Sequence, residues 1–521
     1  MKRIISLLLV LSMSLCLFSG CEDGSHDPHV PTGDALVMEG QDPDSVGPQT
    51  PEDPQEFSLA YYPDRGMNPL ICNDFTNRVL FSLIYQSLFN VNPDYSVEPI
   101  LCSQYQVSTS YRTWTFYLEP NAKFSDGTPV TAEDVLATYQ AAKEGGYYAG
   151  RFTHIHEIAL SEDGGIIFYL TTAYENLPQL LDIPILKASE VASEQPLGSG
   201  PYILSDSLAG TQLVRNPLWW CSDLEFVVSA SAIPLVEARN PAHIRDEFEF
   251  NDVGLVLADP CSDMYADFRC DYELWDVDNG IFLYIGCNSR YVDFLEENTL
   301  RAMLTYGINR EQIVSDNFGG YAQAVTLPAD PSSPYYSKSL AARYSYDPTK
   351  FVEFLGRYGK TEDPIRLMVN SDDSVRLRIA YTIANTFTDY GLPMEVVECT
   401  TAKFQTEFYN ANYDLYLGMT KLSANMDLSP FFAPYGNLSR NGISDEAIYS
   451  LCLESLANQG NYLNLHKAVA DDGRIIPIAF FGYAIYATRG LLTDLNPGRD
   501  NVFAYSLGKT MESIRIPTDY D

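Results

Sequence analysis

The chain has 521 residues, 46% of them hydrophobic, and its 33 Lys and Arg stand against 69 Asp and Glu, which gives a formal net charge of -36. A chain of this length is too long for one hydrophobic core, so two or more lobes are expected. The strongly negative charge would repel a phosphate backbone, which excludes ordinary nucleic-acid binding.

The first twenty residues have the pattern of an export signal. Basic residues at 2–3 precede an apolar run at 4–18, which is shorter than the about 20 apolar residues of a membrane-spanning helix. The Ser-Gly-Cys triplet that ends at Cys21 resembles a bacterial lipobox, although Phe18 stands where Leu is usual. This resemblance implies that residues 1–20 are removed and that Cys21 carries a lipid. Plain signal-peptide cleavage nearby is the alternative.

The segment 21–56 is rich in Asp, Gly and Pro and poor in large apolar residues, which is typical of a disordered tether. A lipid at Cys21 and such a tether would hold the folded body near the outer face of the cytoplasmic membrane, or in the periplasm. The folded body is expected to begin near Phe57.

The first elements of the body are a short strand in FSLAYYP, a turn at Met67-Asn68-Pro69 and a helix within 77–89. The helix is predicted because Leu80, Ile84 and their neighbours recur at helical spacing.

The segment 112–142 predicts a strand, a tight turn and a capped helix. Trp114 and Phe116 belong to a period-two alternation, and Asp126-Gly127 is a turn dipeptide. Thr131 is placed to cap a helix whose first turn holds acidic residues near the positive end of its dipole. From physics alone this is an ordinary supersecondary unit.

The same segment carries a resemblance to a known family. FSDGTPVTAEDV, at 124–135, resembles the signature of extracellular solute-binding proteins, family 5, the peptide- and nickel-type receptors of ABC importers. Similar segments follow as PLGSGPYIL at 196–204, as LRAMLTYGINREQIV at 300–314, which is expected to form one helix, and as RIIPIAF at 474–480. The resemblance weakens over 221–280.

The resemblance implies an α/β fold of two lobes, like the type II periplasmic-binding-protein fold in its large peptide-receptor subclass. Two crossing strands, near 279–288 and 479–488, would join the lobes and let them hinge. The expected first lobe is discontinuous, with residues 57–282 and a return segment at 485–521, and the second lobe spans 283–484.

The implied function is capture of a small solute, with an oligopeptide favoured, and its delivery to the permease subunits of an ABC importer. The sequence has no GxSxG elbow, P-loop, HExxH or EF-hand loop, so we expect no enzyme activity, no cofactor and no metal. We also expect a monomer. An exported hydrolase, or a surface receptor that senses its ligand without importing it, are the alternatives.

Peptide receptors of this family hold the ligand's amino group with an Asp in a D-P-x-x-F-F segment, and Asp427 occupies that place in DLSPFF. Its alternative role is a loop or helix cap. The weaker candidates for ligand contact, each with a structural role as its alternative, are Tyr62, Asn68, Tyr85, Asn288 and Tyr483.

His154 and His156 could form a metal pair on one side of a strand, but a surface accident is the expected explanation. Export permits disulfides, and Cys261 and Cys270 are close enough in sequence to close a small loop. Spacing alone does not show that these two sulfurs meet.

Overall fold

The computed structural model describes residues 57–208, 210–224, 226–259, 268–290, 293–358, 361, 363–438, 442–492 and 494–517. Residues 55–521 form one compact unit. The expected signal, Cys21 and the tether lie outside the described residues, and so does Cys261.

A long mixed sheet organises the described residues. Its strand order is β15-β14-β16-β12-β17-β11-β1-β10-β9-β8, and β13 pairs with β17. The strands of this sheet are β1 Leu59–Tyr61, β8 Tyr202–Ser207, β9 Gly210–Arg215, β10 Ala232–Glu237, β11 Leu255–Ala258, β12 Tyr272–Cys287, β13 Ala322–Ala324, β14 Ile365–Asn370, β15 Met394–Cys399, β16 Leu415–Lys421 and β17 Ile475–Thr488. A smaller antiparallel sheet contains β4 Cys102–Val107, β5 Thr113–Leu118, β7 Ile166–Leu170 and β6 Ile155–Leu160, and a ribbon pairs β2 Phe89–Val91 with β3 Val97–Pro99.

The helices cover these sheets. Those before β12 are α2 Phe75–Ile84, α3 Ala132–Glu144 and α4 Pro241–Glu249. Those between β12 and β17 are α5 Asp293–Glu296, α6 Asn298–Leu304, α7 Arg310–Phe318, α8 Lys338–Ala341, α9 Pro348–Tyr358, α10 Ser374–Asp389, α11 Thr401–Tyr409, α12 Ser429–Phe432, α13 Glu446–Ala457 and α14 Tyr462–Asp472. Among the described residues, none of these helices has the length and apolar composition to cross a membrane.

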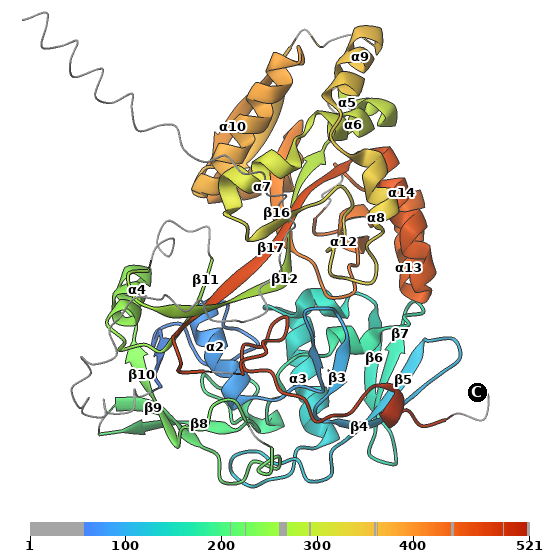
Figure 1. The fold of residues 1–521 in the computed structure, drawn as a ribbon. Coiled ribbons are helices and arrows are strands. Elements are labelled where there is room, and N and C mark those ends of the chain that lie inside the picture. The colour runs from blue at the N-terminus through green and yellow to red at the C-terminus, as the bar shows by residue number, and fades with distance from the viewer. Residues whose placement is uncertain are drawn as a thin grey trace, which may run out of the picture. The chain divides into compact units, whose positions relative to one another are not determined.

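Strands β12 and β17 are the two crossing strands that the resemblance implied. Figure 1 shows them running side by side from the elements around α2 and α4 to those around α7 and α10. Their antiparallel register shifts between Val277 and Ile281, where β17 has only Gly482 between the matching residues. Gly280 sits in this bulge with a φ of 76°, a conformation that glycine adopts without strain.

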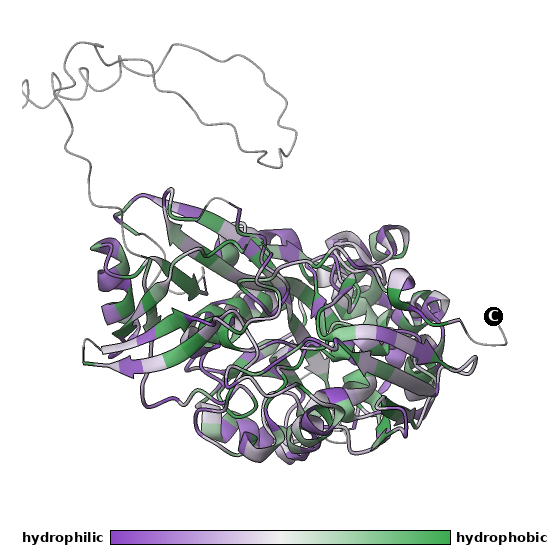
Figure 2. Cartoon of the chain, turned by 90° about the horizontal axis from the view of Figure 1, so that it is seen from below, coloured by the Kyte–Doolittle hydropathy of each residue, from purple (hydrophilic) through white to green (hydrophobic). Residues whose placement is uncertain are grey.

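Two large hydrophobic cores lie toward the two ends of the crossing strands, and a further core packs Val91 and Tyr95 of one end against Phe282 and Tyr284 of the other. One large core includes Leu80, Phe116 and Leu235, and the other large core includes Leu283 and Ile379. We call residues 57–277 and 484–517 the first lobe, and residues 281–481 the second lobe. Figure 2 shows the apolar residues, in green, concentrated along the strands in the middle of the body. This arrangement agrees with the two-lobed fold expected from the sequence.

The segment 112–142 folds as its sequence predicts. Trp114 and Phe116 face the first core from β5, and α3 begins directly after Thr131. The Asp134 carboxylate accepts hydrogen bonds from the Thr131 backbone N–H and hydroxyl, both at 2.8 Å. This capping arrangement satisfies donors that the first helical turn leaves unpaired.

Two predicted helices have different limits in the structure. The helix expected within 77–89 is α2, which starts at Phe75 after the cap Asp74 and ends before Tyr85, because the chain then extends toward β2. The single helix expected over 300–314 is broken into α6 and α7. Gly307 packs against Phe387 at this break, and a β-carbon there would crowd the Phe387 ring, so tertiary packing outweighs the helical pattern.

Candidate functional site

An open cleft is lined by residues of both lobes. It encloses about 760 Å³ of empty space, its open mouth included. The first lobe contributes Tyr147, Arg151 and Arg499, and the second lobe contributes Lys421 and Asp427, among others. Charged side chains from both lobes therefore face one space, which is where a ligand would be enclosed.

A second cavity adjoins this cleft at the crossing strands. Tyr147, Lys421 and Arg499 line both spaces. The second cavity also contacts Asn279 in the β12 bulge and Tyr483 on β17. The cleft thus continues to the point at which the two lobes are joined.

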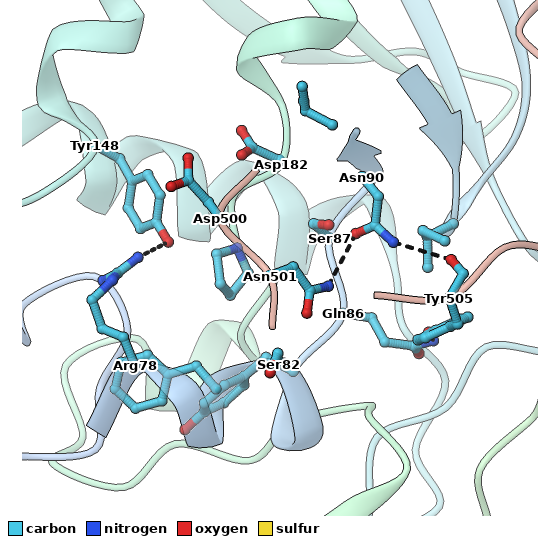
Figure 3. Close-up of a pocket in the computed structure, with 15 residues that line it drawn as sticks. Arg78, Ser82, Gln86, Ser87, Asn90, Tyr148, Asp182, Asp500, Asn501 and Tyr505 are labelled. Atoms are coloured by element: carbon cyan, nitrogen blue, oxygen red, sulfur yellow. Dashed lines mark hydrogen bonds between the residues drawn. The ribbon is translucent and has the colours of Figure 1, made fainter. Parts of the chain in front are cut away.

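A third cavity lies within the first lobe and is drawn in Figure 3. Asn90 donates from Nδ2 to the Tyr505 carbonyl at 3.2 Å and accepts from Asn501 Nδ2 at 3.3 Å. Arg78 donates from Nη2 to the Tyr148 hydroxyl at 2.7 Å. Asp500 lines both this third cavity and the second cavity, so the chain around Asp500 lies between them.

Three cations converge on the carboxylate of Asp500, and we call Arg151, Lys421, Arg499 and Asp500 the basic cluster. Asp500 Oδ2 lies 3.3 Å from Arg499 Nη1 and 3.7 Å from Arg151 Nη2, and Oδ1 pairs with Lys421 Nζ. Burial by itself would raise the pKa of Asp500, but the three cations lower it well below its ordinary value. Asp500 is therefore ionised at neutral pH.

Two tyrosines and a further arginine extend the basic cluster. The Arg78 guanidinium lies 3.7 Å from the centroid of the Tyr147 ring, within range of a cation–π interaction. Lys421 donates to the Tyr147 hydroxyl at 3.2 Å. Arg151 is also paired with Asp182. Aromatic and cationic groups thus form a continuous wall from α2 to the second lobe.

A second contact between the lobes joins His154 to Asp427. His154 Nε2 lies 3.1 Å from Asp427 Oδ2, and Asp427 Oδ1 accepts from the Ser429 backbone N–H at 2.8 Å. Both side chains are buried. The leading candidate of the sequence analysis therefore lines the cleft, with its carboxylate bonded across it.

The side chains of the two predicted asparagines form hydrogen bonds with backbone groups in this structure. Asn68 Nδ2 donates to the carbonyls of Val191 and Ser193 at 2.9 and 2.8 Å. Asn288 Nδ2 donates to the carbonyls of Ala411 and Tyr413, both at 2.9 Å. Neither is among the residues of the cavities described above.

The predicted tyrosines lie at three different places. Tyr62 is buried, and its backbone exchanges hydrogen bonds with the side chain of Asn77. The Tyr85 hydroxyl donates to two backbone carbonyls, and its ring lines the cavity of Figure 3. Tyr483 lines the second cavity, and its ring centroid lies 4.6 Å from that of Phe75. The structure brings Asp427 and Tyr483 near the basic cluster, but not Tyr62.

Cys270 carries a free thiol, so the disulfide that its spacing from Cys261 would allow is not formed at this residue. His154 contacts Asp427 and not a second histidine, and His156 is exposed. Among the described residues, no group of three or more His, Cys, Asp or Glu is arranged to hold a metal ion.

Sequence reasoning missed every member of the basic cluster. A usable signal was present, since Arg151 follows a Tyr-Tyr pair and Arg499-Asp500 follows the return strand. Basic residues are scarce in this acidic chain, so cations next to aromatic residues are informative. The convergence of these positions is a product of the tertiary fold, because Lys421 and Asp500 are 79 residues apart.

Comparison with known proteins gives consistent matches. The sequence profile of bacterial extracellular solute-binding proteins, family 5 (middle region), matches residues 96–442. The chain is 22% identical over 481 residues to a Brucella melitensis protein named as a binding protein, covering 76% of this chain and 77% of that one. It is 24% identical over 308 residues to the glutathione-binding protein GsiB of Escherichia coli, covering 56% of this chain and 59% of that one.

A solved structure from Clostridium difficile, described as a peptide binding protein AppA, superposes with a TM-score of 0.71. The match covers 86% of this chain and 98% of that one at 16% sequence identity. At this level of identity the likeness concerns the fold, and the ligand of this chain has to be argued from its own residues.

Proposed function

Because this chain belongs to the bacterial extracellular solute-binding proteins of family 5, we propose that it is a lipid-anchored receptor that captures a small solute between its lobes and delivers it to an ABC permease. One observation supports this most directly: charged side chains from both lobes line a single open cleft. Such a cleft can bind a solute without breaking any bond in it.

Closure of the lobes over the solute is part of the proposal. The two crossing strands keep the lobes connected, and the bulge at Gly280 opposite Gly482 offers backbone freedom where the lobes meet. The proposal places the domain boundaries inside the crossing strands, with residues 57–282 and 485–521 on the side of the first lobe and 283–484 on the side of the second, so that the crossing strands act as the hinge between the two lobes defined above.

An oligopeptide is the favoured solute. Extended peptides bind through their main chain, which tolerates varied sequences, and a carboxylate can hold the amino terminus by a charge-assisted hydrogen bond. Asp427 is the candidate for that role, and the ligand's amino group would take the place of His154 on its carboxylate.

The role of Asp427 is tested by calorimetric titration of the Asp427→Ala variant with a peptide found to stabilise the wild-type protein. We expect the affinity to fall about tenfold or more, since a charge-assisted bond is lost. Asp163→Ala is a control, because the Asp163 carboxylate accepts hydrogen bonds from Ser161 and Tyr117 and lines none of these cavities. Unchanged affinity in the Asp427 variant would remove this role from Asp427.

The solute itself is best identified by mass spectrometry of material that co-purifies with the native protein. A library of short peptides should then raise the melting temperature, because a ligand that binds the folded state stabilises it by mass action. Intact peptide recovered after long incubation is expected of a receptor, whereas cleaved peptide would favour the hydrolase alternative. Failure of all peptides, together with a different co-purified solute, would refute the peptide assignment and leave the receptor in place.

The anchor and the transport role need separate tests. A Cys21→Ala variant should move from the membrane fraction to the soluble fraction of cells, since one lipid-modified residue holds the body at the membrane. Uptake of labelled solute that depends on neighbouring permease and ATPase subunits would distinguish an importer from a sensing receptor.

A further inference from the structure

The basic cluster and its neighbours carry more positive charge than their carboxylate partners neutralise. Among the described residues, Arg151, Lys421 and Arg499 line the cleft, Arg78 lines the second cavity that adjoins it, and the carboxylates in direct contact with these four cations are Asp182 and Asp500. Arg78 instead bonds to a tyrosine hydroxyl and to two backbone carbonyls.

A local excess of cations is unusual in a chain with so many acidic residues. Asp and Glu outnumber Lys and Arg by 69 to 33, so carboxylates are plentiful for any purely structural ion pairing. Buried cations are normally paired, because removal from water disfavours the charged form. A cluster that stays under-neutralised in such a chain is suited to receive negative charge from outside.

Unused hydrogen-bonding capacity lies in the same place. Arg499 is buried, and its Nε has no hydrogen-bond partner among the described residues. The side-chain oxygens of Asn279 and Asn501, which line the second cavity with Arg499, are also buried without a partner there. Buried polar groups are satisfied in most proteins, so orphaned groups beside a cavity point to an absent ligand or water.

Two other acidic groups close to these cations are engaged elsewhere. Asp427 is bonded to His154 and to the Ser429 backbone, and Asp330 accepts from the Tyr95 hydroxyl at 2.8 Å. Neither forms an ion pair with the cations of the basic cluster. Asp500 itself shows that a carboxylate fits among cations from both lobes.

We propose, on the basis of the receptor function above, that the solute carries a carboxylate, and that this carboxylate binds in the cleft beside Asp500, among Arg151, Lys421 and Arg499. Guanidinium groups bind carboxylates through paired, charge-assisted hydrogen bonds. Arg151 and Arg499 belong to the first lobe and Lys421 to the second, so the anion is held by both lobes and favours the closed form. A solute with an amino group would place it toward Asp427, which lines the same cleft.

The test uses short peptides prepared in pairs, each as the free acid and as the C-terminal amide, together with simple dicarboxylates such as succinate. Binding is measured by calorimetry and by the shift in melting temperature. We expect wild-type protein to prefer the acid over the amide by roughly tenfold or more, and this preference to weaken as salt is added. The Lys421→Gln and Arg151→Gln variants should lose most of the preference.

Lys467→Gln is the matched control, because Lys467 is an exposed lysine of α14 that pairs with Asp471 and lines none of these cavities. It should keep the full preference for the acid. The melting temperature of each variant without ligand shows whether it is folded, and Lys421→Gln should fold because its side chain is partly exposed.

Equal binding of acids and amides, or a Lys421→Gln variant that keeps the preference, would overturn this inference and leave the receptor function intact. Binding of dicarboxylates without any peptide would uphold the inference and refute the peptide assignment. If the protein carries no co-purified solute and binds neither library, the receptor function fails and the inference fails with it.

Discussion

Two pairs of buried arginines differ in what surrounds them. Arg301 and Arg310 lie inside the second lobe, whereas Arg151 and Arg499 line the cleft between the lobes. All four guanidinium groups are largely removed from water. The comparison shows how a buried charge that serves the fold can be distinguished from one available to a ligand.

The interior arginines are bound mainly to backbone carbonyls, and Arg301 also pairs with the Asp472 carboxylate of its own lobe at 2.9 Å. Arg310 donates from Nε to the Pro477 carbonyl at 2.7 Å and from Nη1 to the Thr305 carbonyl at 2.9 Å. Arg301 donates from Nη1 to the carbonyls of Leu295 and Glu296 at 2.8 and 2.6 Å. These carbonyls end short helices or sit on β17, so the two arginines connect helices to the crossing strand and have little capacity left.

The cleft arginines share the carboxylate of Asp500 with a lysine from the other lobe, and Arg151 is also paired with Asp182. Lys421 belongs to the other lobe from these two arginines, and Arg499 keeps an unpaired donor among the described residues. A partner shared with the other lobe, and not burial, therefore separates the structural arginines from the candidate binding ones.

The largest expected effect is on stability, in the Arg310→Met variant. Burial lowers the pKa of Arg310 to about 10, so the guanidinium is still charged at neutral pH. Its removal leaves buried carbonyls of Thr305 and Pro477 without donors, and we expect a loss of about 4 kcal/mol in the free energy of unfolding. Urea denaturation followed by circular dichroism measures this.

Arg343→Met is the control, because the Arg343 side chain is exposed. It should change stability by less than about 0.5 kcal/mol. If Arg310→Met is as stable as this control, the interior arginines do not stabilise the fold, and the distinction between interior and cleft arginines is wrong.

His466 extends the comparison from buried arginines to a buried histidine that has no hydrogen-bond partner among the described residues. His466 is fully buried on α14, both ring nitrogens lack partners among the described residues, and burial lowers its pKa to about 3. Below the ordinary pKa of 6.5, His466 binds a proton in the unfolded chain but not in the folded protein. The free energy of unfolding therefore falls as the pH drops from 6.5 toward 3. At pH 4.5 the loss from this group is about 2.5 kcal/mol.

The His466→Leu variant should therefore lose less stability than the wild-type protein between pH 6.5 and 4.5. Denaturant titrations at both pH values measure the difference, with the exposed His156→Gln as the control. Equal acid sensitivity in wild type and His466→Leu would show that His466 is accessible to protons in the folded state.

The smallest expected effect concerns the contact between Gly280 and Arg499. Gly280 and Gly66 have the same φ of 76°, but a β-carbon on Gly280 would overlap the Arg499 guanidinium, whereas one on Gly66 meets nothing within 4 Å. Gly66→Ala should cost about 1 kcal/mol from backbone strain alone, and Gly280→Ala about 2 kcal/mol. Only Gly280→Ala should also weaken binding of an acidic solute, measured by calorimetry.

Equal changes in stability and in binding for the two glycine variants would show that the Gly280 bulge does not influence the cleft. It would then follow that Arg499 does not depend on the backbone of the crossing strand.

Much of the fold was predictable because its signals are local. The alternation around Trp114, the turn at Asp126-Gly127 and the cap at Thr131 act within a few residues, and the structure has a strand, a turn and a helix there. The break at Gly307 was not predictable, since it depends on Phe387, a residue of α10. The same limit applies to the site: Asp427 was found through a local motif, whereas its partner His154 comes from another lobe.

Sequence alone determined the membership of a family, the two crossing strands and the overall acidity of this protein, because motifs, periodicity and charge are properties of neighbouring residues and of composition. Only the tertiary structure decided which few cations meet around Asp500. Those side chains come from a short 3-10 helix after α3, the end of β16 and the segment after β17. Electrostatic interaction depends on distance in space and on burial, and neither quantity is written in the order of the residues.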